Sequence, residues 1–137
     1  MEESKFNFTV PTKVTPQQIC NLLCTAFDGN MTSCWAGWKT IMPDESDWSW
    51  CTPEDRKTWD DVRKCYVAAM CGGMVVIVDH EEDDKEYILD RAALHRGVKA
   101  MSEKFPEHWA DFINENDDAI TGDIFVQCCV FGDTVYG

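Results

Sequence analysis

The chain has 137 residues, of which 45% are hydrophobic and 12% aromatic; this is enough to build one domain over residues 1–137 and too much for a disordered chain. Its 25 acidic and 12 basic residues give a net charge of −13, so direct binding to nucleic-acid phosphates is not expected. The absence of a long apolar run and of a secretory signal predicts a cytoplasmic protein without membrane association.

The first predicted elements are a short strand over residues 6–10 and a helix that starts at Thr15. The sequence Thr-Pro-Gln-Gln places Thr15 at the cap, proline at the first helical position and Gln18 at the third, which is a capping-box pattern. Gly29 is expected to end this helix. A strand over residues 33–42 and a long loop over 43–58 are predicted next.

The middle of the chain predicts a sheet. Residues 61–70 are expected to form a strand, and the Gly72-Gly73 pair predicts a hairpin from it into a second strand at 74–78. Residues 81–85 form a charged turn, after which residues 86–89 are expected to pair back antiparallel.

Helices dominate the remainder. Asp90 is predicted to cap a helix with one apolar stripe, formed by Leu94, Val98, Met101 and Phe105. The opposite face is basic and is expected to offset neighbouring acids, with phosphate binding as the alternative; it carries Arg91, Arg96, Lys99 and Lys104. Pro106 is predicted to begin a short helix.

The C-terminal segment predicts the centre of the core. From residue 124 to 131 only Gln127 is polar, so the segment is expected to be buried on nearly every side. Thr121 is predicted to cap this helix and Gly132 to end it. The expected fold class is therefore α+β, with an antiparallel sheet of four to five strands and three to four helices packed on one face.

The same segment carries a resemblance. It contains the runs Glu-Asn-Asp-Asp-Ala from Glu115, Thr-Gly-Asp-Ile-Phe-Val-Gln from Thr121 and Val-Phe-Gly-Asp-Thr-Val-Tyr-Gly from Val130. These runs resemble the ending of small uncharacterised proteins encoded by tailed phages and prophages. The resemblance is strongest over residues 86–137 and weak over 43–73. It implies a phage origin, and hence the host cytoplasm, but no activity or catalytic residue.

No catalytic motif, cofactor or metal site is predicted. The chain lacks a nucleophile elbow, a P-loop, a dinucleotide fingerprint and a zinc-protease motif. His80 lies among acidic residues, but neighbours on a strand point to opposite faces and so do not form a metal site together. The eight cysteines show no CxxC spacing and are interpreted as buried structural thiols. A metal site, redox chemistry and a Cys–His nucleophile pair formed only in the fold remain alternatives.

Charge and aromatic residues point to a binding surface. Three acidic clusters occur, at residues 43–61, 79–86 and 105–137, and the first surrounds two tryptophans. Tryptophans in an acidic loop are good interface residues, although covering a sheet edge or lining a nucleobase pocket are alternatives. The predicted partner-binding residues are Trp48, Trp50, Asp44, Glu45, Asp47, Glu54, Asp55, Glu81, Glu82, Asp83, Asp84, Asp117 and Asp118.

The functional prediction is a phage-encoded acidic protein that binds and modulates a host protein, such as an anti-defence inhibitor occupying a basic surface. The alternatives are a nucleotide-sequestering module and a virion or assembly component. Oligomeric state is not predicted.

Overall fold

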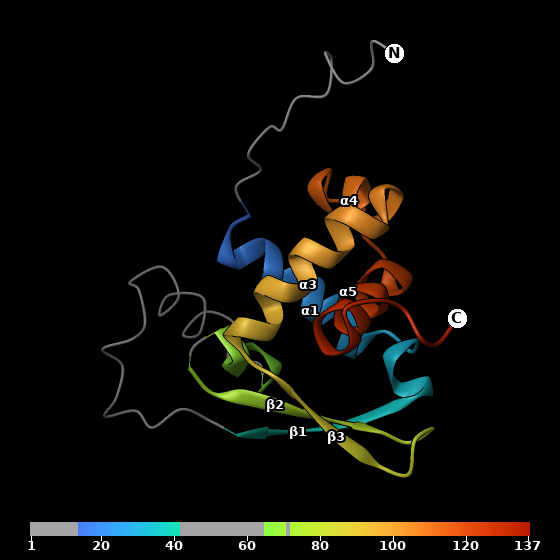
Figure 1. Ribbon diagram of the computed structural model, residues 1–137. Helices are drawn as coiled ribbons and strands as arrows, with labels where there is room; N and C mark the ends of the chain where they lie inside the picture. Colours follow the sequence, from blue (N-terminus) through green and yellow to red (C-terminus); the bar gives the residue numbers. More distant parts are fainter. Residues whose placement is uncertain (1–13, 42–64, 71) are drawn as a thin grey trace.

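The computed structural model describes residues 14–41, 65–70 and 72–137. In this part of the chain the element order is α1 (Pro16–Asp28), η2 (Thr32–Cys34), β1 (Ala36–Ile41), η3 (Cys65–Met70), β2 (Met74–Asp79), β3 (Lys85–Leu89), α3 (Arg91–Lys104), α4 (Pro106–Ile113) and α5 (Ala119–Phe131). Within these residues the α-helices lie on one side of the sheet, so the predicted α+β class is confirmed (Figure 1).

The described sheet has three antiparallel strands in the order β1-β2-β3. Trp38, Ile77 and Tyr87 lie side by side across it, and Val75 pairs with Leu89. These side chains face the helices, because Val75, Ile77 and Leu89 are fully buried in the core.

Helix α5 lies at the centre of the core, as the sequence predicted. It packs against both α1 and α3, and Phe125, Val126, Cys128 and Cys129 have no exposed surface. Glycines bring the helices close: a Cβ on Gly122 of α5 would lie 2.7 Å from the backbone nitrogen of Ala26 in α1. Gly132 ends α5 with φ of 75°, a left-handed conformation that glycine adopts without strain.

Most of the predicted helix boundaries are confirmed. In α1, the Thr15 hydroxyl accepts from the Gln18 N–H and the Gln18 side chain accepts from the Thr15 N–H, which completes the capping box. Gly29 follows α1, Asp90 caps α3, and Pro106 begins α4. In the α3 stripe, Leu94 and Met101 are buried while Val98 and Phe105 pack against the core.

Three local predictions need correction. Four to five strands were expected, whereas the described residues form three. Residues 65–70 form the 3-10 helix η3 and not a strand, so the glycine pair leads from a helix into β2 and makes no hairpin. The cap of α5 is Asp118, one turn before its predicted position, since the Asp118 carboxylate accepts from the Thr121 N–H at 2.9 Å. The predicted strand at 6–10 and the loop at 43–58 lie outside the described residues.

The basic face of α3 is used within the fold. Arg96 donates two hydrogen bonds to the Cys129 carbonyl, and Lys104 donates one to the Gly132 carbonyl. The last carbonyls of a helix lack intrahelical partners and carry partial negative charge. These two cations therefore stabilise the C-terminal end of α5.

Candidate functional site

A buried carboxylate on α5 is the first component of the candidate site. Asp123 is 6% exposed. One of its oxygens accepts from the Thr32 hydroxyl at 2.8 Å and from the Trp35 indole N–H at 2.9 Å. The other accepts from the Gln127 amide at 2.8 Å. All three donors are neutral, so they orient the carboxylate without balancing its charge.

Gln127, one turn further along α5, fixes the C-terminal segment 133–137. Its side-chain oxygen accepts from the backbone N–H groups of Val135 and Tyr136, at 2.8 and 2.9 Å. Its amide also donates to the Tyr136 carbonyl at 3.0 Å. Gln127, the single polar residue of the apolar run 124–131, thus links segment 133–137 to the core through hydrogen bonds.

Tyr136 joins this segment to the sheet. Its ring stacks on Trp35 with centroids 5.2 Å apart, and its hydroxyl donates to the Asp79 carboxylate at 2.7 Å. Asp79 has no exposed surface and also accepts from the Glu81 N–H. The bond to Asp79, followed by desolvation and by the nearby negative charges, raises the pKa of Tyr136 above its ordinary value.

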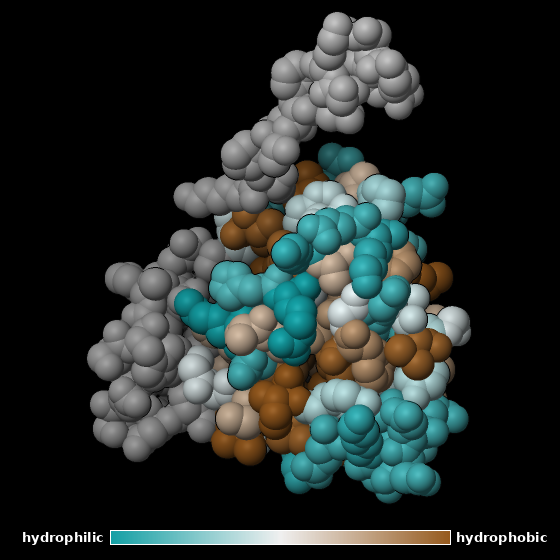
Figure 2. All heavy atoms as spheres, in the orientation of Figure 1, coloured by the Kyte–Doolittle hydropathy of each residue, from teal (hydrophilic) through white to brown (hydrophobic). Residues whose placement is uncertain are grey.

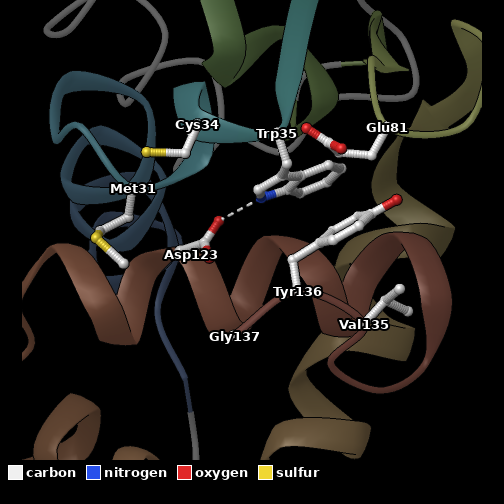
Figure 3. A pocket seen from close by; sticks show the side chains of 8 residues that line it. All are labelled: Met31, Cys34, Trp35, Glu81, Asp123, Val135, Tyr136 and Gly137. Atoms are coloured by element: carbon white, nitrogen blue, oxygen red, sulfur yellow. Dashed lines mark hydrogen bonds between the residues drawn. The ribbon is translucent and has the colours of Figure 1, made fainter.

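Asp123, Trp35 and Tyr136 border a pocket of about 340 Å³. Figure 3 shows Asp123 projecting from α5 toward Trp35, with Met31 and Cys34 on one side and Glu81 and Val135 on the other. The pocket is lined by Met31, Cys34, Trp35, Glu81, Asp123, Val135, Tyr136 and Gly137. It therefore combines apolar and aromatic walls with two carboxylates.

The second component is the turn between β2 and β3. Glu81, Glu82, Asp83 and Asp84 are all exposed here and form part of the hydrophilic patch at the lower right of Figure 2. The Lys85 N–H donates to the Glu82 carbonyl, and Asp83 and Asp84 have φ of 53° and 58°. Two central residues with positive φ are typical of a type I′ hairpin turn, for which Asn-Gly or Asp-Gly is favoured. The chain has aspartate at both of these positions, although glycine would adopt a positive φ with less backbone strain.

The predicted site residues are distributed as follows. Glu81, Glu82, Asp83 and Asp84 come together in this acidic turn, and Glu81 also lines the pocket. Asp118 caps α5, and the Thr121 N–H lowers the pKa of its carboxyl. Asp117 precedes it and is half-buried. The remaining predicted residues lie outside the described part of the chain: Asp44, Glu45, Asp47, Trp48, Trp50, Glu54 and Asp55.

The interpretation of the cysteines as buried thiols is wrong for Cys34, which is exposed and lines the pocket, and is confirmed for Cys20, Cys128 and Cys129. Burial raises the pKa of the Cys128 thiol to about 11 and also raises that of Cys129, so both stay in the weakly reactive thiol form. His80 contacts Asp84 at 2.8 Å in the exposed turn, and His108 contacts the buried Thr121 hydroxyl. Residues 14–41, 65–70 and 72–137 contain no group of three or more His, Cys, Asp or Glu side chains that could hold a metal ion.

The sequence prediction missed Asp79, Asp123 and Tyr136. One signal was present: Asp123 and Gln127 are four residues apart in an otherwise apolar helix, and therefore share a buried face. Paired polar groups inside a core helix indicate a buried hydrogen-bond network. Trp35 is 88 residues from Asp123 in sequence, so its identity as a partner required the fold, whereas Tyr136 lies only nine residues after Gln127.

Comparison of the chain with protein-family models, with curated proteins and with solved structures finds no match. Among the described residues, none of the helices has the length and apolar character required to cross a bilayer.

Proposed function

We propose that this protein is a phage-encoded acidic protein that binds a basic surface of a host protein and thereby modulates it. An anti-defence inhibitor is one such protein. The observation that carries the proposal is the acidic turn, residues 81–84, which places four consecutive exposed carboxylates at the end of a hairpin. The phage origin is supported by the sequence resemblance of the C-terminal segment.

Electrostatics favour a basic protein as the partner. Clustered carboxylates on a protein with a net charge of −13 steer a cationic surface into contact and raise the association rate at low salt. The turn sits at the end of two paired strands, so little conformational entropy is lost when a partner fixes it. Nucleotide sequestration is less well supported, since Asp123 and Glu81 in the described pocket would repel phosphate.

Affinity capture from host lysate tests the proposal, with bound proteins identified by mass spectrometry. The triple variant Glu82→Gln, Asp83→Asn, Asp84→Asn is compared with Glu103→Gln, Glu107→Gln, Asp111→Asn, which removes the same charge from exposed positions on α3 and α4. We expect the turn variant to weaken retention of a basic partner by roughly tenfold, as the sum of three exposed charge contacts, and the control to retain it. Equal retention by both variants, or failure to capture a partner, would contradict the proposal.

A further inference from the structure

The pocket beside the acidic turn has the composition of a site for an organic cation. A carboxylate has about four acceptor positions, and Asp123 uses three of them on Thr32, Trp35 and Gln127. One acceptor position is left on a side chain that is nine-tenths buried and borders the cavity. Burying a carboxylate is costly unless a positive charge compensates it, and its donors in the fold are neutral.

The remaining lining decides which cation fits. Met31, Val135 and the aromatic side chains give the pocket partly apolar walls, of which Val135 is 58% exposed, while the exposed carboxylate of Glu81 supplies a second negative charge. A strongly hydrated ammonium would lose more hydration energy against such walls than a guanidinium, which is weakly hydrated, planar and rich in donors. A divalent metal would require more ligands than the described residues bring together.

We propose that this pocket binds the guanidinium group of an arginine side chain, with Asp123 as the buried acceptor and Glu81 as the acceptor at the rim. The inference deepens the proposed function and rests on it for the source of the arginine, which is the basic surface of the partner. The neighbouring residues Glu82, Asp83 and Asp84 then contact charges around that arginine.

Ligand pairs that differ only in charge provide the first test. Nα-acetyl-arginine amide and Nα-acetyl-citrulline amide have nearly the same shape, but the urea of citrulline is neutral. Binding is followed by the NMR chemical shift of the Trp35 indole N–H, which donates to Asp123. We expect the arginine ligand to shift this signal in a saturable, salt-sensitive manner and the citrulline ligand to leave it unchanged. Equal shifts with both ligands would overturn the proposal.

Matched protein variants provide the second test. Glu81→Gln and Asp83→Asn each remove one negative charge from the same turn, but Glu81 lines the pocket. We expect Glu81→Gln to weaken binding of the arginine ligand by roughly two- to fivefold, the range of an exposed ion pair, and Asp83→Asn to have a smaller effect. Equal losses would show that only the general negative field of the protein matters, and the pocket would be refuted.

A third comparison identifies the source of the cation and separates the two proposals. An acetylated Gly-Gly-Arg-Gly-Gly peptide that binds more tightly than the free arginine ligand indicates a protein source, whereas equal binding indicates recognition of a small cation. Binding of the arginine ligand without capture of a host protein would support the pocket and refute the proposed function. Capture of a host protein that is unaffected by competing arginine ligand and by Glu81→Gln would support the proposed function and refute the pocket.

Discussion

Helix α5 and the acidic turn between β2 and β3 differ in the kind of residue that they contain: buried and closely packed residues in α5, exposed and charged residues in the turn. In α5 eight of the thirteen residues are buried, and glycine at position 122 allows backbone contact with α1. In the turn, residues 81–84 are exposed, and two of them adopt positive φ that glycine would adopt at lower cost. The core therefore uses residues that minimise strain, whereas the turn retains charge despite strain. Strain kept at an exposed position is a reason to look for function there.

The largest expected effect on the free energy of unfolding comes from a substitution in the core, in α5. Gly122→Ala should lower the free energy of unfolding by about 2 kcal/mol, because the new methyl group would overlap the Ala26 backbone, which cannot rotate away. Chemical denaturation measures the change. Gly132→Ala is the control: its Cβ would meet nothing within 4 Å, so only the positive φ opposes it, at a cost of about 1 kcal/mol. A smaller effect at Gly122 than at Gly132 would contradict the close approach of α1 and α5.

The network that joins α5 to the C-terminal segment should be almost as sensitive. Gln127→Leu keeps the approximate volume but removes four hydrogen bonds, two of them from backbone N–H groups. We expect a loss of roughly 2 kcal/mol and faster hydrogen exchange at Val135 and Tyr136. Gln17→Leu is the matched control, since that exposed amide bonds only Asn21, and a cost below about 0.5 kcal/mol is expected. Unchanged exchange at Val135 in the Gln127 variant would disprove the role of this side chain.

Much of this fold follows from local sequence signals. The capping box at Thr15, the cap at Asp90 and the stop at Gly132 are local patterns whose geometry depends on a few neighbouring residues, and each was predicted correctly. Residues 65–70 were predicted wrongly as a strand. A short apolar run is compatible with several backbone conformations, and the packing around it determines which one forms.

The candidate site was predicted only in part for a related reason. The charge of residues 81–84 is visible in the sequence, and so is their location in a turn. The pocket depends on Asp123 and Tyr136 from the C-terminal part of the chain and on Trp35, which is 88 residues from Asp123 in sequence. The periodicity of the sequence does not predict these contacts, because each of them depends on how α5 packs against the sheet.

Substitutions that relieve backbone strain in the acidic turn are expected to stabilise the protein. Asp83→Asn with Asp84→Gly introduces the favoured type I′ pair and should stabilise the protein by about 1 kcal/mol. The same variant should retain less of a basic partner. Asp83→Asn with Asp84→Asn is matched in charge and lacks the glycine, so it should weaken partner retention equally with less gain in melting temperature. If the glycine variant were not the more stable of the two, strain at position 84 would not be a cost to the fold.

The smallest expected effect is a pH dependence at the junction of the two regions, where Tyr136 contacts Asp79. The hydrogen bond to Asp79 raises the pKa of Tyr136 above its ordinary value of 10.0, so the folded protein retains this proton at a pH where the unfolded chain releases it. Stability from this group is therefore fully present below pH 10 and is lost as the pH rises through the folded pKa. In urea denaturation between pH 8 and 11, the stability difference between the wild type and Tyr136→Phe should shrink above pH 10. Tyr87→Phe, which leaves the Tyr136–Asp79 bond intact, should keep the wild-type decline, whereas a pH-independent difference for Tyr136→Phe would show that Asp79 does not bind this proton more tightly in the fold.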